Sequence, residues 1–194
     1  MAAMTEKRLL NVDWSKIPAP TDDGAARHLA GATVPPVALA ATDGSTVTLA
    51  TLKGRIVVFA YPRTGEPGKA SLVDDWDMIP GARGCTPQTC SFRDLFADLM
   101  RAGAQAVFGL STQSTAYQHE MVERLHVPFA VLSDEKLALT KAMRLPTMDV
   151  AGQTLIKRLA LVIDDARISK VFYPVFPPDS NAGDVLAWLQ ANPR

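Results

Sequence analysis

Two cysteines, Cys85 and Cys90, are the residues of this sequence whose type and spacing most directly suggest chemistry. They lie in the segment from Gly84 to Asp94, where a long loop gives way to an expected amphipathic helix. The first turn of a helix has unpaired backbone N–H groups and the positive end of the helix dipole, and both favour an anion. Thiolate is the nucleophilic form of cysteine, and helix N-termini are among the places where it is stabilised. Cys85 is therefore placed to react as a nucleophile.

The spacing of the two cysteines restricts how they can pair. On a regular helix, residues five apart have Cα atoms about 8.6 Å apart, which follows from a rise of ~1.5 Å and a turn of ~100° per residue. A disulfide requires Cα atoms closer than about 7 Å. If Cys85 and Cys90 do form a disulfide, this turn must unwind, and catalysis is then coupled to a conformational step. The spacing alone leaves open the alternative that both are small buried hydrophobic residues.

Other uses of the two thiols have weaker support in the sequence. A C-x₄-C pair with only His28, His119 and His126 elsewhere lacks the paired ligand spacing of structural zinc sites, so no metal is expected. A thiol–disulfide oxidoreductase acting on protein disulfides is a further alternative, but the C-x-x-C spacing of such enzymes is absent. A third is a non-enzymatic redox sensor or interaction module, in which oxidation reshapes the neighbouring loop.

Composition sets the broad class of the protein. The 194 residues suit one domain of ordinary size, and 20 Lys and Arg balance 20 Asp and Glu. A net charge of zero predicts no binding to nucleic acid or to an anionic membrane. No apolar run approaches the roughly 18 residues that span a bilayer, and the first residues lack the apolar core of a signal peptide. Two cysteines without an export signal indicate redox chemistry in a reducing cytoplasm, and no cofactor is expected.

The chain is expected to divide into an N-terminal arm, residues 1–33, and one domain, residues 34–194. The domain begins with a predicted β-hairpin, in which residues 37–39 and 46–49 flank an Asp-Gly turn. Residues 55–61 (RIVVFAY) form a continuous β-branched and aromatic run, which is typical of a strand covered on both faces.

The rest of the domain alternates helices and strands. A helix is expected over residues 86–101, with Gly103 as its C-terminal stop. The other expected elements are strands at 104–110 and 129–132, helices at 114–125 and 135–143, a strand pair at 155–163 and 168–173, and a last helix from Asn181. This order favours an α/β fold with a central mixed β-sheet flanked by helices.

Several of these segments together resemble peroxiredoxins, and most of all their bacterioferritin-comigratory, or Q-type, branch. The resemblance covers roughly Val34 to the C-terminus, and its motifs are specific only in combination. They are Tyr61-Pro62, the block Gly84-Cys85-Thr86-x-x-x-Cys90-x-Phe92-Arg93-Asp94, Phe108-Gly109-Leu110-Ser111-Thr112, Phe129 through Ser133-Asp134, Lys157-Arg158 and the ending Val185-Leu186-x-Trp188-Leu189.

The resemblance implies a thioredoxin-like fold and a thiol peroxidase that reduces hydrogen peroxide and organic hydroperoxides. Cys85 would be the peroxidatic cysteine, and Cys90 the resolving one, because this branch carries it five residues on in the same helix. Arg158 matches the family's arginine on a neighbouring strand, which holds the thiolate and polarises the peroxide. The implied partners are a hydroperoxide and a thioredoxin-like reductant, and the chain would act as a monomer or homodimer.

One motif of the family is missing. Peroxiredoxins usually carry Pro-x-x-x-Thr-x-x-Cys, but counting back from Cys85 gives Ala82 where Thr belongs and Met78 where Pro belongs. The inserted segment 65–83 displaces the motif, and Thr64 or Thr86 would then supply the hydroxyl, with Thr86 alternatively serving as a helix cap. The apolar residues of the segment are expected to cover the active site, to form a dimer contact or simply to pack down; they are Trp76, Met78 and Ile79.

Overall fold

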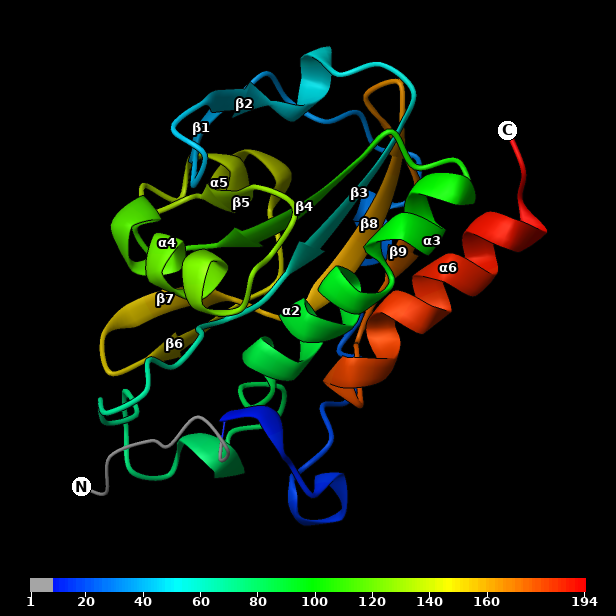
Figure 1. The fold of residues 1–194 in the computed structure, drawn as a ribbon. Coiled ribbons are helices and arrows are strands. Elements are labelled where there is room, and N and C mark those ends of the chain that lie inside the picture. Colours follow the sequence, from blue (N-terminus) through cyan, green and yellow to red (C-terminus); the bar gives the residue numbers. More distant parts are fainter. Residues whose placement is uncertain (1–8) are drawn as a thin grey trace.

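A seven-stranded mixed sheet forms the centre of the computed structural model, which describes residues 9–194 (Figure 1). The strand order is β2-β1-β5-β4-β3-β8-β9, in which β3, β4 and β5 are parallel and the remaining neighbours are antiparallel. The strands are β1 (Ala38–Ala41), β2 (Thr46–Thr48), β3 (Arg55–Ala60), β4 (Ala106–Ser111), β5 (Val131–Ser133), β8 (Leu159–Asp164) and β9 (Arg167–Phe172). The expected mixed sheet and its N-terminal hairpin are confirmed.

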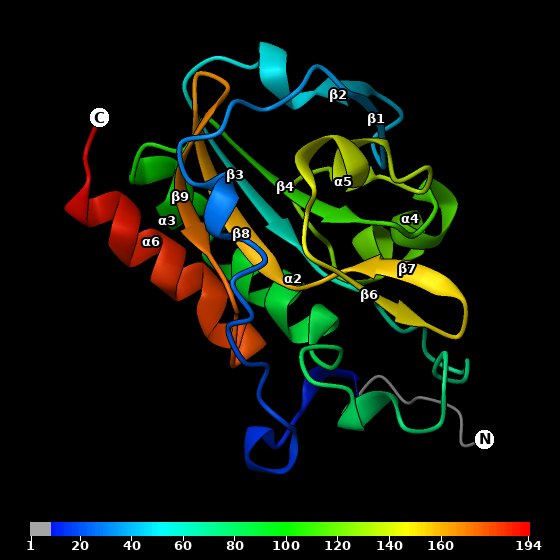
Figure 2. The same ribbon diagram turned by 180° about the vertical axis from the view of Figure 1, so that it is seen from behind.

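Helices cover both faces of this sheet. They are α2 (Cys85–Asp94), α3 (Phe96–Arg101), α4 (Thr115–Arg124), α5 (Ala138–Met143) and α6 (Asn181–Ala191). Buried residues of α2, α3, α4 and α6 share one apolar cluster on one face, whereas α5 and the 3₁₀ turn Arg27–Leu29 belong to the cluster on the other face. Figures 1 and 2 show the two sides of the sheet.

Strand β3 is the centre of the core. All six of its residues are buried, which confirms the reading of this run as a strand covered on both faces. Its side chains alternate between the two apolar clusters, as the two-residue period of a strand requires. Phe59 stacks on Phe92 of α2, with ring centroids 4.1 Å apart, so the strand fixes the position of the helix that carries both cysteines.

The helix expected over residues 86–101 is interrupted, and in this respect the expectation was wrong. Leu95 leaves the helical conformation, with ψ of 7°, and separates α2 from α3. No glycine or proline marks this position. The contact of Phe96 with Phe129, whose ring centroids lie 5.7 Å apart, shows that tertiary packing rather than a local breaker sets the course of the chain here.

The expectation of a single strand over residues 155–163 was also wrong. It divides into β7 (Gln153–Ile156) and β8, and β7 pairs with β6 (Thr147–Val150) in a separate two-stranded sheet that was not expected. Lys157 and Arg158 lie between the two strands, where the Lys157 N–H donates to Pro146 O at 2.8 Å. This break is needed because Arg158 turns into the protein interior, where it is 2% exposed.

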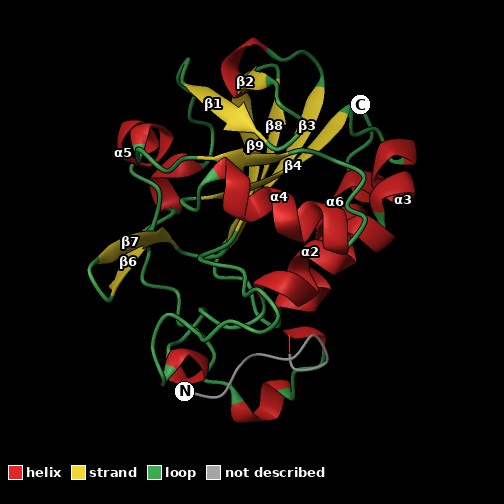
Figure 3. Cartoon of the chain, turned by 60° about the vertical axis from the view of Figure 1, so that its left-hand side comes forward, coloured by secondary structure: helices red, strands yellow, loops and turns green. Residues whose placement is uncertain are grey.

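Residues 9–33 of the arm pack on the domain rather than away from it. Leu29 is buried in the same cluster as residues of β8, and Thr33 forms an isolated bridge with Arg167 of β9. Figures 1 and 3 show the part of the arm that begins at residue 9 in a loop-rich layer at one end of the sheet, together with the inserted segment. A boundary at residue 34 stays a prediction. Within residues 9–194, no helix combines the length and apolar character that a membrane span requires.

The packing of α3 gives a prediction about stability. Leu99 is 0% exposed, so Leu99→Ala is expected to lower the free energy of unfolding by about 2–5 kcal/mol through lost burial and a residual cavity. Leu10, which is 37% exposed, provides a matched control, and Leu10→Ala is expected to change stability by less than about 0.5 kcal/mol. Urea unfolding of the two variants measures the difference, and equal losses would contradict the assigned core.

Candidate active site

The first turn of α2 places Cys85 where the sequence predicted it. Gly84 is the N-cap with φ of +103°, and Cys85 is the first helical residue. A Cβ at Gly84 would lie 2.6 Å from Cη2 of Trp14 and 2.7 Å from Cγ of Pro178, so both the backbone conformation and the space require glycine. Thr86 is therefore not the N-cap. This tight junction fixes the start of the helix and with it the position of the sulfur.

The Cys85 sulfur lies beside a guanidinium. The Arg158 Nη2 is 3.2 Å from the Cys85 Sγ, and the Cys85 thiol donates to the Ala82 carbonyl oxygen at 3.5 Å. Cys85 is 3% exposed and Arg158 2%. A cation at this distance, added to the N-terminal end of a helix, stabilises negative charge on sulfur.

The guanidinium of Arg158 is held from three directions. The two N–H groups of its Nη2 are shared between the sulfur and three successive carbonyl oxygens at the end of the inserted segment, those of residues 81–83, at 3.0–3.2 Å. Its Nη1 donates to Gln88 Oε1 of α2 at 2.5 Å, and the Gln88 Nε2 donates to Asn181 Oδ1 of α6 at 2.9 Å. The loop, the cysteine helix and the C-terminal helix thus converge on one side chain.

Sequence reasoning did not identify Gln88 or Asn181. Both are buried, at 0% and 1% exposure, and they are linked to the sulfur through Arg158. A signal for Gln88 was present, because a polar residue three positions after Cys85 lies on the same face of the helix as the sulfur. Asn181 carried no such signal, because only the fold brings the start of α6 to this point.

Cys90 occupies a different environment from Cys85. Both side chains belong to the apolar cluster between α2 and the sheet, but Cys85 lies beside the Arg158 guanidinium, whereas burial is the largest influence on Cys90 and raises the pKa of its thiol. Both cysteines are free and both are within α2, which is helical from residue 85 to residue 94. Because residues five apart on a regular helix have Cα atoms too far apart for a disulfide, joining the two sulfurs requires the first turns of α2 to unwind.

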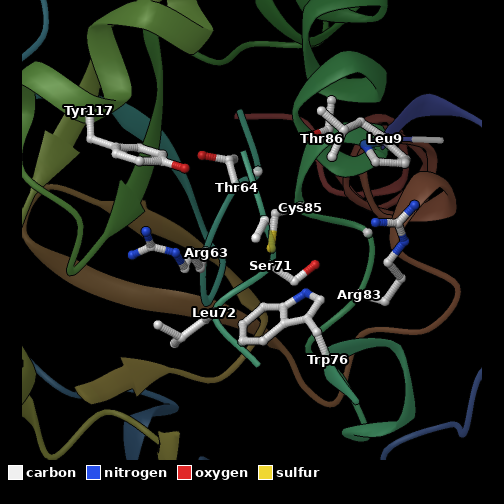
Figure 4. Close-up of a pocket in the computed structure, with 14 residues that line it drawn as sticks. Leu9, Arg63, Thr64, Ser71, Leu72, Trp76, Arg83, Cys85, Thr86 and Tyr117 are labelled. Atoms are coloured by element: carbon white, nitrogen blue, oxygen red, sulfur yellow. The ribbon is translucent and has the colours of Figure 1, made fainter. Parts of the chain in front are cut away.

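A small pocket of about 30 Å³ opens onto Cys85. This volume accommodates about one or two water-sized molecules. Figure 4 shows the Cys85 sulfur between Thr64 on one side and Ser71 and Trp76 of the inserted segment on the other. The lining residues come from four parts of the chain, and they are Leu9, Arg63, Thr64, Gly65, Ala70, Ser71, Leu72, Trp76, Arg83, Gly84, Cys85, Thr86, Pro87 and Tyr117.

Thr64 and Thr86, the two candidates for the missing hydroxyl, both line this pocket. Thr64 lies four residues after the end of β3 and is 1% exposed. Its backbone N–H and its Oγ1 both donate to Gln113 Oε1, at 2.8 and 3.1 Å. With its proton committed to Gln113, the Thr64 oxygen is oriented to accept a hydrogen bond from a molecule in the pocket.

The inserted segment forms one wall of the site. Trp76 is 7% exposed and packs in an apolar cluster with Val150 and Leu155 of the β6–β7 hairpin. Met78, in contrast, is 62% exposed. The hairpin that sequence analysis missed therefore supports the loop that covers Cys85.

The three histidines lie in no cluster of potential metal ligands. His28 contacts Met143 O through its Nε2 at 2.9 Å, and His119 lies 3.4 Å from Glu123 on the exposed face of α4. Among residues 9–194, no group of three or more His, Cys, Asp or Glu side chains is arranged to hold a metal ion.

Comparison with solved structures defines the class of protein. A crystal structure of the peroxidoxin BcpB from Mycobacterium tuberculosis matches with a TM-score of 0.67 and 27% identity, covering 85% of this chain and 98% of that one. Peroxiredoxin Q from Xanthomonas campestris matches with a TM-score of 0.63 at 22% identity, covering 80% of this chain and 90% of that one. These neighbours confirm the expected thioredoxin-like peroxiredoxin fold.

Sequence relatives define the branch. The Redoxin family model matches residues 29–186. Peroxiredoxin Q, chloroplastic, of Sedum lineare is 31% identical over 163 residues, which is 83% of this chain and 77% of that protein. Its counterpart in Oryza sativa subsp. japonica is 32% identical over the same share of this chain, but the match spans only 66% of the rice protein. The chain therefore belongs to the redoxin family, and within it to the Q-type, or bacterioferritin-comigratory, peroxiredoxins.

The environment of Cys90 gives a prediction about pH. In a Cys85→Ser variant, where Cys90 is the sole cysteine, thiolate absorbance is expected to appear at higher pH in the folded protein than in the urea-unfolded chain, because burial disfavours the charged form. The Cys85→Ser/Cys90→Ser double variant supplies the background from tyrosine ionisation. An equal or lower midpoint in the folded protein would contradict this assignment.

Proposed function

We propose that this protein is a thiol peroxidase in which Cys85 is the peroxidatic cysteine, Cys90 the resolving cysteine and Arg158 the residue that activates sulfur and peroxide. The observation that carries the proposal is the 3.2 Å contact between the Arg158 Nη2 and the Cys85 Sγ, at the start of a helix and at the base of a pocket. The substrate is a hydroperoxide, which this pocket admits beside the sulfur.

In the first step the Cys85 thiolate attacks the terminal oxygen of the hydroperoxide. A sulfur–oxygen bond forms and the oxygen–oxygen bond breaks, so that sulfur is oxidised to sulfenic acid. The leaving oxygen takes a proton and departs as water or an alcohol. The Arg158 guanidinium faces the charge that develops on the peroxide oxygens, and the Thr64 Oγ1 is the acceptor proposed for the substrate O–H.

In the second step the first turns of α2 unwind and Cys90 condenses with the sulfenic acid. A disulfide forms between Cys85 and Cys90, and one water molecule is released. An external dithiol of the thioredoxin type then reduces this disulfide by thiol–disulfide exchange and is itself oxidised. The raised pKa of Cys90 fits this order, because a protonated thiol does not compete with Cys85 for the peroxide. The reductant required is available in a reducing compartment, for which we propose the cytoplasm.

Single-cysteine variants test the two roles. Cys85→Ser is expected to abolish peroxide turnover, and Cys90→Ser to take up one oxygen on Cys85 from one equivalent of hydrogen peroxide without turning over with thioredoxin. Mass spectrometry after one equivalent, together with steady-state peroxide consumption, provides the readout. If Cys85→Ser turns over fully and Cys90→Ser does not, the two roles are reversed.

The same assays distinguish the competing functions. Faster reduction of insulin disulfides than of peroxide would indicate a thiol–disulfide oxidoreductase instead. Stoichiometric oxidation of the wild-type chain without turnover in the presence of thioredoxin would indicate a redox sensor.

Substitution of the arginine tests its part in the reaction. Arg158→Lys keeps a positive charge but cannot bind Gln88 and three carbonyl oxygens in the planar geometry of a guanidinium. Loss of the positioned donor is expected to lower kcat/KM for hydrogen peroxide about 10²–10³-fold. Arg101→Lys, on the exposed surface of α3, is the matched control and is expected to leave kcat/KM unchanged. An equal effect of both substitutions would remove Arg158 from the mechanism.

A further inference from the structure

The N-terminal arm supplies a residue to the Cys85 pocket. Leu9 is 3% exposed and lines the pocket, although it lies 20 positions before the region that matches the family model, which begins at residue 29. It packs closely on the start of the inserted segment, since a Cβ at Gly65 would lie 2.7 Å from the Leu9 Cδ2. Leu9 and Gly65 thus meet at the wall of the pocket.

The segment after Leu9 is anchored next to the catalytic helix. The Trp14 indole N–H donates to Asp179 Oδ2 at 2.9 Å, and the Trp14 ring meets Phe176 edge-on, with centroids 6.0 Å apart. The same ring fills the space where a side chain at Gly84 would be. The arm is therefore fixed against the N-cap of α2, five residues beyond Leu9.

A second anchor holds the arm beside the catalytic arginine. Asp23 accepts hydrogen bonds from the Lys157 Nζ at 2.6 Å and from the Tyr173 hydroxyl at 2.7 Å. Lys157 directly precedes Arg158. These groups are partly exposed and contribute modestly to stability, but they define the path of the arm around the site.

Leu72 and Trp76 of the inserted segment also bound the pocket. Figure 4 shows Trp76 and Leu72 below the Cys85 sulfur and Leu9 on the side of Thr86, so that apolar side chains of two non-adjacent segments bound the space. The volume of about 30 Å³ fits hydrogen peroxide, whereas the alkyl or aryl group of an organic hydroperoxide has to pass between these apolar walls to bring its peroxide oxygens to Cys85.

We infer that the N-terminal arm, through Leu9, is a specificity element that restricts access to Cys85 to small hydroperoxides. This inference rests on the proposed peroxidase function and adds the substrate size to it. Apolar walls discriminate modestly by size, with one methylene group changing relative rates about 10- to 200-fold. Shortening Leu9 to alanine removes three carbon atoms from the wall, and this is the space that a bulkier hydroperoxide needs.

The test compares hydrogen peroxide with cumene hydroperoxide as substrates of the full-length chain. For Leu9→Ala, the ratio of kcat/KM for cumene hydroperoxide to kcat/KM for hydrogen peroxide is expected to rise about tenfold over wild type. Leu10→Ala is the matched control, because Leu10 is the adjacent residue of the same type and is 37% exposed outside the pocket. Its ratio is expected to equal that of the wild type.

The outcomes separate the inference from the function on which it rests. If the wild type consumes neither peroxide, the proposed function is wrong. If the wild type turns over hydrogen peroxide and Leu9→Ala leaves the ratio unchanged, the specificity role of the arm is overturned while the peroxidase function stands. A Leu9→Ala variant that loses activity equally towards both substrates would also overturn it, since Leu9 would then be only structural.

Discussion

The buried positive charge of the Arg158 guanidinium constrains which groups can surround it. Among residues 9–194, the hydrogen-bond acceptors around it are three carbonyl oxygens, the Gln88 amide oxygen and the Cys85 sulfur, and of these only the sulfur can carry a negative charge. A buried cation is costly unless it is paired. The group at which the proposed reaction occurs is thus the one neighbour of Arg158 that can balance its charge, and the role proposed for Cys85 follows from how the fold accommodates one positive charge.

The same network resists the conformational step that the proposed cycle requires. Gln88 lies between Cys85 and Cys90 in α2, so unwinding this turn must disturb its bonds to Arg158 and Asn181. Each net hydrogen bond contributes on the order of 1 kcal/mol, and more when one partner is charged. Formation of the disulfide would have to offset this loss, which ties the redox state of the cysteines to the contact between α2 and α6.

Local sequence patterns predicted those features that depend on neighbouring residues. The apolar run of β3 identified a central strand, the Asp43-Gly44 turn identified the first hairpin, and the helix signal after Gly84 placed Cys85 at an N-terminus. Arg158 was placed beside Cys85 by family resemblance alone. The predictions that failed concern contacts between residues that are distant in sequence. The partnership of Gln88 with Asn181 is invisible to periodicity, because 93 positions of the chain, including β4 to β9 and α3 to α5, separate them.

The displaced threonine motif shows how the site keeps its parts when their order in the chain changes. The 19 residues 65–83 separate Thr64 from Gly84, yet Thr64 lines the Cys85 pocket because the chain that leaves β3 passes beside the first turn of α2. The insertion then supplies apolar wall residues, among them Leu72 and Trp76, and the arm supplies Leu9 on the side of Thr86 (Figure 4). Thr64 is available to the pocket because of its position after β3, and not because of its spacing from Cys85. A motif written as a fixed number of residues before the cysteine therefore misses it.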